Sequence, residues 1–383
     1  MAKVERIEPT QLPNGLWLNG NEYASENVEE SSGVLSLVTG ETDGYRVGPE
    51  LDLSAISDVG RSKLEWTSSG DVEVLAAVSE VSAQGCGDLD GIDDYYAVGT
   101  GSQFALSSFS IFVRFRCTKK GVNGLHTIVS RQKDTSASGR NYTLWLSEGS
   151  PFSAPANSAW LDVGDTDGSI LSLFASDKDY LDGAWHTLLA IVDDSVKTGY
   201  LYADGALRHT DSYTGSPYTG DSPTTIGRQA SGVERFFLGN IYNCIIYSDV
   251  LSLPDYQALI NGNIADGNRQ GHWPLDDSPG STTARDLSGN NNNGTIIGAS
   301  YSPDNPLLQQ ATNGQAIPGI SVNDDLTGKK LYTQQRFNRD TTGDPSPTLT
   351  SLTAEVNGTG GAFSLINGGL IRSAHTQNNT MIR

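Results

Sequence analysis

Short apolar runs that alternate with polar residues recur along most of the chain. The clearest are rich in Val, Ile, Phe, Tyr and Leu and lie at 64–66, 72–78, 110–116, 142–146, 185–192, 199–203 and 236–247. A period of two over about four to eight residues is typical of half-buried β-strands. Gly, Asp, Ser and Pro gather between these runs, for example at 85–87, 162–168 and 215–223, and favour turns. The pattern therefore predicts an all-β protein.

One short segment predicts a helix instead. From Ser252 to Ile260 the apolar residues recur at helical spacing, and an Asn-Gly-Asn stop follows. Ser252 is a favourable N-cap, and Pro254 suits the first helical turn. Because this helix is short, it leaves the prediction of an all-β protein unchanged.

The length of 383 residues exceeds that of one ordinary domain, so we expect two or three. Residues 87–302 carry their own strand series and four of the six tryptophans. The flanks 32–84 and 308–358 hold about 50 residues each, too few to bury a core alone, but about 100 together, a common sandwich size. We predict a discontinuous outer β-sandwich, 32–84 plus 308–358, into which 87–302 is inserted as a second sandwich.

The two chain ends are polar. Residues 1–31 read as an N-terminal arm and residues 359–383 as a C-terminal tail, with a hairpin around the Asn-Gly at 367–368. Arms that fold against neighbouring subunits are common in assemblies, and an unstructured tail is the equal alternative.

Charge and cysteine content narrow the classes of partner. The chain has 25 basic and 45 acidic residues, a net charge of −20, which repels nucleic-acid phosphates. It has neither a spanning apolar stretch nor a secretory leader pattern at its start, so we expect a soluble product made in a cytoplasm, without membrane insertion. Cys86, Cys117 and Cys244 form no CxxC pair and are expected to be buried thiols. The five histidines show no zinc-site spacing.

Residues 88–260 resemble the laminin-G-like (concanavalin-A-like) jelly-roll family. Five blocks carry the resemblance in the family's order, at 88–98 (DLDGIDDYYAV), 183–192 (GAWHTLLAIV), 199–207 (GYLYADGAL), 225–228 (TIGR) and 239–252 (GNIYNCIIYSDVLS). Residues 273–295 are similar to a family segment that often precedes the opening strand, whereas here it follows the last one. The resemblance implies a jelly-roll sandwich, which we expect residues 276–297 to complete.

The outer halves resemble a β-sandwich module common in structural proteins of tailed bacteriophages. Its first half is similar to residues 47–56, 62–70 and 72–78, and its second half to 313–320, 325–331 and 347–356. This resemblance implies a virion protein.

Catalytic patterns are missing from the sequence. A retaining glycoside hydrolase on the concanavalin-A-like fold needs two carboxylates about 5–5.5 Å apart, supplied by an ExDxxE strand. The Glu-x-Asp at Glu41-Thr-Asp43 has Arg46 at the position of the acid, and it lies outside the jelly roll. There is no GxSxG, and His186 sits in an alternating strand as a core or sheet-surface residue. We expect no enzymatic activity.

Calcium is the cofactor that the resemblance suggests, because laminin-G-like domains often hold one calcium ion at the sandwich rim. The positions that match or neighbour the family's ligand segments are Asp286, Asn290 and Asn292, together with Asn243, which replaces the usual Asp. Turns rich in Asp and Asn present the oxygen ligands that calcium prefers. The alternative is that these residues form Asx-turns and bind no metal. The Asp-rich segment at 162–169 lacks the Glu of a calcium loop and reads as a turn.

A sugar site needs an aromatic platform with polar neighbours. The candidates are Trp160, in the predicted loop at 157–160, and Tyr213 and Tyr218 in the Gly/Ser/Pro-rich loop before Thr224. Each is equally consistent with a lid over the edge of the core. Trp185 and Trp66 lie in alternating strands and are expected to be core residues.

The sequence as a whole predicts a non-enzymatic bacteriophage virion protein in a tail-fibre, baseplate or capsid-decoration position. Its lectin-like jelly roll would project outward and adhere to host-surface or environmental glycans. Its other partners would be further virion proteins and copies of itself, with a trimer as one arrangement. The alternative is a purely structural decoration or connector protein without glycan binding, and a polysaccharide hydrolase is a third, weaker hypothesis.

Overall fold

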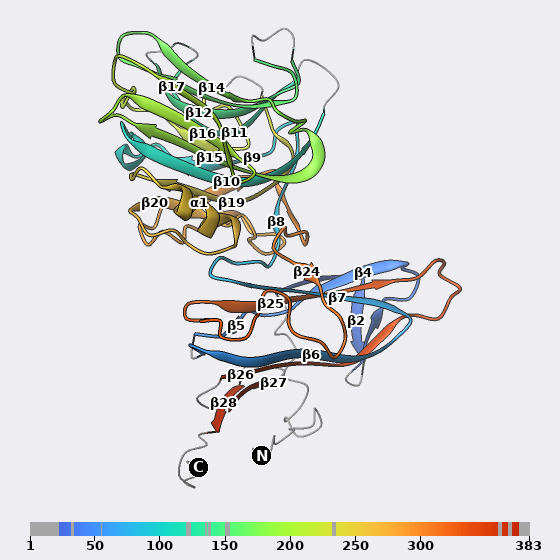
Figure 1. The fold of residues 1–383 in the computed structure, drawn as a ribbon. Coiled ribbons are helices and arrows are strands. Elements are labelled where there is room, and N and C mark those ends of the chain that lie inside the picture. Colours follow the sequence, from blue (N-terminus) through green and yellow to red (C-terminus); the bar gives the residue numbers. More distant parts are fainter. Residues whose placement is uncertain are drawn as a thin grey trace. The chain divides into compact units, whose positions relative to one another are not determined.

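The computed structural model describes residues 23–31, 34–54, 56–119, 124–134, 136, 139–149, 154–231, 235–358, 362–366 and 370–374. The chain divides into two compact units (Figure 1). One comprises Gly85–Asp304, and the other combines the segments Met1–Gln84 and Asn305–Arg383. The structure is nearly all β, which confirms the predicted fold class.

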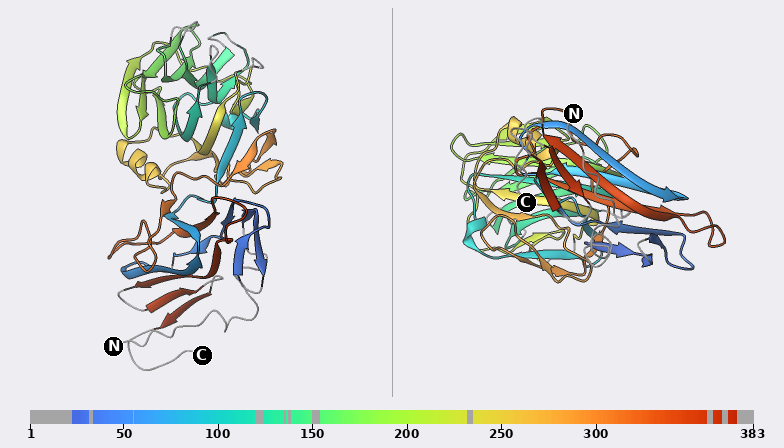
Figure 2. Two further views of the ribbon diagram at one scale, coloured as in Figure 1. Left: turned by 90° about the vertical axis from the view of Figure 1, so that its right-hand side faces the viewer. Right: turned by 90° about the horizontal axis from the view of Figure 1, so that it is seen from below.

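The unit Gly85–Asp304 is a sandwich of two eight-stranded antiparallel sheets (Figure 2). The first, which we call the helix-bearing sheet, has the order β17-β16-β15-β10-β19-β8-β23, with β20 also paired to β19. Its strands are β8 (Cys86–Asp90), β10 (Phe109–Thr118), β15 (Asp182–Asp193), β16 (Thr198–Ala203), β17 (Ala206–Ser212), β19 (Leu238–Tyr247), β20 (Arg269–Trp273) and β23 (Ser300–Ser302).

The second sheet, which we call the facing sheet, has the order β14-β13-β12-β11-β18-β9-β22-β21. Its strands are β9 (Tyr95–Gly99), β11 (Leu125–Gln132), β12 (Arg140–Ser147), β13 (Ser158–Gly164), β14 (Ile170–Ala175), β18 (Thr224–Ile226), β21 (Thr283–Ala284) and β22 (Gly294–Ile297). Because β22 pairs with β9, the late segment at 276–297 completes this sheet as predicted.

The core of this unit lies between the two sheets. Alternate residues of each strand point inward, as Ile111, Val113 and Phe115 of β10 do. All three cysteines are buried free thiols, which confirms their predicted role.

A short helix, α1 (Leu253–Ile260), covers part of the outer face of the helix-bearing sheet. Ser252 caps it, and the side chains of Ser252 and Asp255 form a capping box, as the sequence pattern predicts. Tyr256 and Leu259 pack on Phe112 and other apolar residues of the sheet. Arg114, two residues further along β10, donates to the carbonyls of Leu259 and Ile260 at the end of the helix. The face beyond Arg114 is therefore not covered by α1.

The other unit combines strands from both chain ends in two sheets. One has the order β1-β4-β25-β7-β24, with β5 also paired to β25, and consists of β1 (Ala24–Glu26), β4 (Asp43–Val47), β5 (Leu51–Asp52), β7 (Asp71–Ser79), β24 (Gln309–Gln310) and β25 (Lys330–Asn338). The other has the order β2-β3-β26-β6 and consists of β2 (Val28–Ser31), β3 (Val34–Leu37), β6 (Val59–Ser69) and β26 (Thr348–Gly358). Their shared core includes Leu64, Val74 and Leu331.

The chain ends differ in part from expectation. Residues 24–31, expected in the N-terminal arm, form β1 and β2, because backbone pairing with β4 and β3 extends the sheets into this polar segment. In the predicted tail, β27 (Ala362–Ile366) pairs antiparallel with β28 (Leu370–Ala374), while the Asn-Gly at 367–368 lies outside the described residues. Residues 1–22 of the arm and 375–383 of the tail lie outside the described residues. The part of the chain that the structure describes contains no helix with the length and apolar character needed to span a membrane.

Candidate functional site

A row of side chains crosses the outer face of the helix-bearing sheet in the region beyond Arg114. In the antiparallel register Trp185 lies opposite Arg116, Arg116 opposite Asn240, and Asn240 opposite Asp88. Directly opposite residues of antiparallel strands share one face of the sheet. Phe115 and Cys117 of β10 point into the core, so the row faces outward. We call Trp185, Arg116, Asn240 and Asp88 the polar row.

The members of the polar row hold one another in place. The Asn240 Oδ1 atom accepts from Arg116 Nε at 3.0 Å and from Nη2 at 2.7 Å, while Asn240 Nδ2 donates to Asp88 Oδ1 at 3.1 Å. Arg116 Nη2 also pairs with Asp304 Oδ2 at 2.8 Å, and the guanidinium lies 5.4 Å from the centre of the Trp185 ring. These contacts fix a rotamer-rich arginine before any ligand arrives.

A pocket of about 470 Å³ opens beside the polar row. Its polar lining comes from Asp88, Asp90, Arg116, Thr118 and Asn240, and the rest of its wall from Leu89, Gly183, Leu238 and Gly239. This volume is in the range of small-ligand sites. Gly239 has a φ of +126°, and a Cβ there would lie 2.2 Å from the Arg116 carbonyl oxygen, so the close approach of β10 and β19 requires glycine.

The carboxylates that line the pocket can still accept hydrogen bonds from water or from a ligand. Asp88 and Asp90 are both exposed. Residual desolvation raises the pKa of Asp88, although Arg116 and the Asn240 amide oppose this shift. Asp90 Oδ1 accepts the backbone N–H of Ile92 at 2.7 Å, which anchors Asp90 in the turn after β8. The site thus offers carboxylate acceptors, a hydroxyl and amide groups to a polar ligand.

Trp160 lies in a strand, so its predicted place in a loop is wrong. It belongs to β13, which starts at Ser158, and lies opposite Trp145 and Phe174 on the neighbouring strands. Its ring stacks on both, with centroid separations of 5.7 Å and 5.5 Å and interplanar angles of 25° and 29°. Because neighbours cover both faces of the indole, Trp160 presents an edge rather than a platform.

The two tyrosine candidates have other contacts. Tyr213 donates its hydroxyl to Asp194 Oδ1 at 3.0 Å, and Lys197 Nζ lies 5.7 Å from the centre of its ring. It also packs against the edge of the core. Tyr218 is half-buried, and its backbone N–H donates to the Gly164 carbonyl at 2.9 Å. Among the described residues, no ring contact joins Trp160 to either tyrosine.

The calcium candidates form a hydrogen-bonded loop. Both oxygens of Asp286 accept donors, from the backbone N–H groups of His272, Ser288 and Asn292 and from the Ser288 hydroxyl, at 2.7–2.9 Å. Asn290 and Asn292 both donate their amides to the Gln270 carbonyl. Asn243 is buried and accepts from His272 Nε2 at 2.8 Å. In this arrangement the four residues do not form the open oxygen cage that calcium requires, and calcium binding stays a prediction.

A second acidic group lies in the turn after β8. One carboxylate oxygen each of Asp90, Asp93 and Asp94 lie within 4.8 Å of one another. Asp94 is buried, and its Oδ2 accepts the Asp90 N–H at 2.9 Å. The turn adds negative charge beside the pocket.

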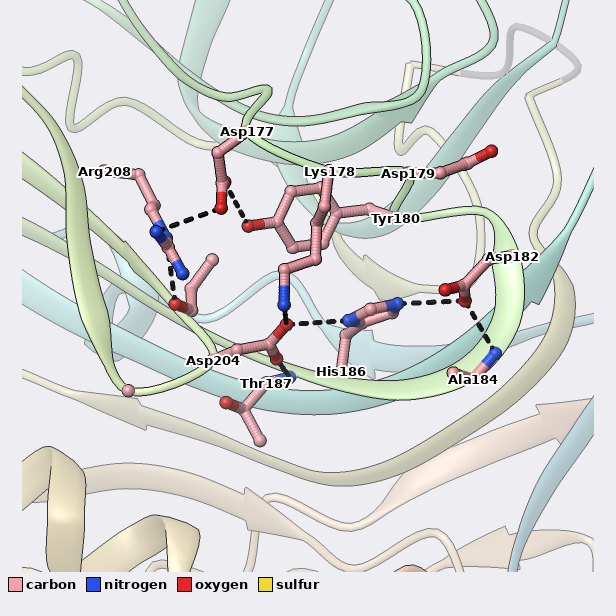
Figure 3. A network of polar contacts seen from close by, with 12 residues as sticks. Asp177, Lys178, Asp179, Tyr180, Asp182, Ala184, His186, Thr187, Asp204 and Arg208 are labelled. Atoms are coloured by element: carbon pink, nitrogen blue, oxygen red, sulfur yellow. Dashed lines mark hydrogen bonds and ion pairs between the residues drawn. The ribbon is translucent and has the colours of Figure 1, made fainter.

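His186, which follows Trp185 near the start of β15, is the centre of a polar network in which its own side chain is buried (Figure 3). Its Nδ1 lies 2.8 Å from Asp204 Oδ2, and its Nε2 lies 3.1 Å from Asp182 Oδ1. Burial alone would lower the pKa of His186, but the two carboxylates raise it. Burial likewise opposes ionisation of Asp204, yet His186, the Thr187 N–H and Lys178 together lower its pKa to about 2. The network ties the loop before β15 to the β16–β17 turn.

Sequence reasoning missed the polar row. Trp185 is half-buried on the outer face beside Arg116, so its predicted core position is wrong. The other tryptophan that we expected in a core, Trp66, is half-buried and packs against the core of the other unit. The available signal was the presence of Arg116 and Asn240 in strands otherwise rich in apolar residues. That signal becomes a site only once the strand order is known.

Comparison with known proteins agrees with the fold. Residues 90–255 match a laminin-G-type family model, described as the concanavalin A-like lectin/glucanases superfamily. No curated protein matches the sequence. Among solved structures, the CBM40 module of the Ruminococcus gnavus IT-sialidase is 20% identical, with 45% of this chain and 97% of that chain covered and a TM-score of 0.35.

Two further solved structures show the range of the likeness. A Bacteroides ovatus protein described as carbohydrate binding is 15% identical over 74% of this chain and 93% of its own, with a TM-score of 0.42. Domains LG4-5 of the mouse laminin alpha1 chain are 16% identical over 50% of this chain and 43% of their own, with a TM-score of 0.29. These likenesses concern the fold and assign no residue roles.

Proposed function

We propose that the concanavalin-A-like domain at residues 90–255 and the strands that complete it bind glycan in the pocket beside the polar row. We further propose that the protein is a non-enzymatic structural component of a tailed-bacteriophage virion, in which this domain serves adhesion. The observation that carries glycan binding is the pocket itself, in which carboxylates, an amide, a hydroxyl and a fixed guanidinium converge next to a tryptophan.

The pocket offers what a sugar ring needs. Carboxylates such as Asp88 accept hydrogen bonds from sugar hydroxyls, and the Thr118 hydroxyl both donates and accepts. Trp185 and Leu238 offer apolar surface for the C–H face of the ring. Because Asn240 and Asp304 already hold Arg116, little side-chain entropy is lost on binding.

The virion role rests on the resemblance of the flanking segments to phage structural modules. In the structure, strands from both segments share their sheets, as such a module requires: β25 pairs with β7, and β26 with β6. The expected partners are other virion proteins and further copies of this chain.

A glycan array probed with the full-length protein tests the proposal. We expect saturable binding to at least one glycan class, weakened about tenfold or more by Asn240→Ala, because this change releases both Arg116 and Asp88. Trp160→Ala is the matched control on the facing sheet and should leave the affinity unchanged, with folding of both variants checked by thermal unfolding.

Two results would contradict the assignment. Loss of binding in Trp160→Ala, with Asn240→Ala unaffected, would move the site to the facing sheet. Silence of the folded protein across the array would favour the purely structural decoration or connector role.

Hydrolysis is a second candidate function, because Asp88 and Asp90 alternate along β8 and both line the pocket. Glycosidases use two carboxyls, one of which has a raised pKa, and the pKa of Asp88 is raised. This candidate predicts release of reducing ends from a bound glycan and loss of that release in Asp88→Asn. A glycan that is bound by the folded protein but never cleaved would exclude hydrolysis of that glycan.

A further inference from the structure

The charges around the pocket are unequal. Asp88 and Asp90 line it, while Arg116 is the one basic residue of the lining, all of which the structure describes. Asp93 and Asp94 add two more carboxyls in the turn that carries Asp90. The surroundings of the pocket are therefore acidic, in line with the net charge of −20 for the whole chain.

The one lining cation already has partners. Its Nη2 pairs with Asp304 at 2.8 Å, and its Nε and Nη2 both donate to Asn240 Oδ1. An incoming carboxylate would meet a guanidinium whose charge Asp304 already offsets, and it would lie near Asp88, which is held to the same amide. Bringing like charges together in this way opposes binding strongly.

The acceptors of the pocket match hydroxyl and ammonium donors instead. Asp88 receives one hydrogen bond from Asn240 Nδ2, and a carboxylate has about four acceptor sites. Adjacent hydroxyls of an uncharged sugar can donate to such a carboxylate without changing the Arg116–Asp304 pair. A sugar ammonium group donates equally well and adds Coulombic attraction.

We propose that the pocket selects uncharged and amine-bearing sugars and excludes sugars that carry a carboxylate, such as uronic and sialic acids. This inference rests on the proposed glycan binding at the polar row. The ligand class follows from the balance of charge at the pocket. The carboxyls of four aspartates outnumber the one guanidinium, which Asp304 already neutralises; these aspartates are Asp88, Asp90, Asp93 and Asp94.

Matched probes on the full-length protein test this selection. The pairs are oligogalactose with oligogalacturonate, lactose with sialyllactose, and chitin oligosaccharides with their deacetylated forms, at low and at physiological salt. We expect the acidic member of each of the first two pairs to bind about tenfold or more weakly than its neutral partner, with the difference larger at low salt. The deacetylated oligosaccharides should bind at least as tightly as the acetylated ones.

The double variant Asp88→Asn, Asp90→Asn removes two negative charges with little change in shape. It should reduce the neutral-to-acidic preference about tenfold, whereas Asp211→Asn, on the exposed strand β17 at the other edge of the sheet, should leave that preference unchanged. Equal or tighter binding of the acidic probes by the wild-type protein overturns the charge selection but leaves glycan binding standing. Absence of binding to every probe overturns both.

Discussion

Asn240 uses both ends of its side-chain amide in the polar row. The oxygen accepts from Arg116 and the nitrogen donates to Asp88, so one neutral residue links two opposite charges. Asp204 has a similar linking role near the β16–β17 turn, where it binds His186, Lys178 and a backbone N–H. It also occupies the first position of a two-residue Asp-Gly turn, with a φ of +45°.

The Asp204–His186 contact predicts a pH-dependent stability. The lowered pKa of Asp204 stabilises the fold above about pH 3.8, and this contribution is lost as the pH falls toward 2. The raised pKa of His186 stabilises the fold below about pH 6.5, and this contribution is lost as the pH rises through the folded-state pKa. Between these limits Asp204→Asn should lower the free energy of unfolding by about 1–2 kcal/mol.

Denaturant unfolding from pH 3 to pH 8 measures this effect. Asn tolerates the same turn conformation, so the substitution tests charge rather than backbone strain. The exposed Asp211→Asn is the control. Parallel stability profiles of Asp204→Asn and wild type would show that the contact does not depend on charge.

At the scale of elements, α1 depends on its cap. The Ser252 and Asp255 side chains satisfy backbone N–H groups that would otherwise lack partners at the start of the helix. Ser252→Ala should therefore cost about 1 kcal/mol of stability, seen as a lower melting temperature. Ser252→Thr keeps the hydroxyl and should restore most of it, whereas equal melting temperatures for wild type and Ser252→Ala would show that packing alone holds the helix.

The strand β6 is at the edge of its sheet, and a loop rather than another strand covers its outer side. Asn313 accepts from the Trp66 N–H at 3.0 Å and donates to the Trp66 carbonyl at 2.8 Å, and Gly314 and Gln315 bond to Leu64. Asn313→Ala should cost about 1–2 kcal/mol and expose an edge that pairs with other chains. Light scattering during mild heating should show earlier aggregation than in wild type, and an unchanged aggregation onset would contradict this role.

Local patterns in the sequence predicted the strands and the helix well, but not which strands lie next to one another in the sheets. The strands near 110–116, 185–192 and 236–247 and the helix from 253 follow from periodicity and capping. The polar row does not, because it requires β10 to lie between β15 and β19 and β8 to lie on the far side of β19. Trp160 was misplaced because Asn157, with a φ of +60°, ends the loop earlier than the polar residues around it suggest.

At the scale of the whole molecule, the two chain ends depend on each other. The long strands β6 and β7 find their main partners, β26 and β25, about 250 to 300 residues later. A chain that ends at residue 304 should therefore leave residues 23–84 open to proteolysis.

A chain in which a short Gly/Ser loop replaces residues 86–303 should keep the β-sheet signal and unfold cooperatively. Rapid proteolysis of this second chain would show that its two segments do not form a unit by themselves.

The strands at which the chain enters and leaves Gly85–Asp304 are direct neighbours, with Cys86 opposite Ser302. Backbones paired in this way are only about 5 Å apart. The two ends of this lectin-like unit are therefore as close together as the two ends of a tight hairpin, whatever the size of the unit. Recombination at these two points would exchange it, as a cassette, for another sandwich with adjoining ends. If the domain binds glycan as proposed, its sugar preference would then evolve by replacement of whole cassettes, while the strand pairings of the recipient stay as they are.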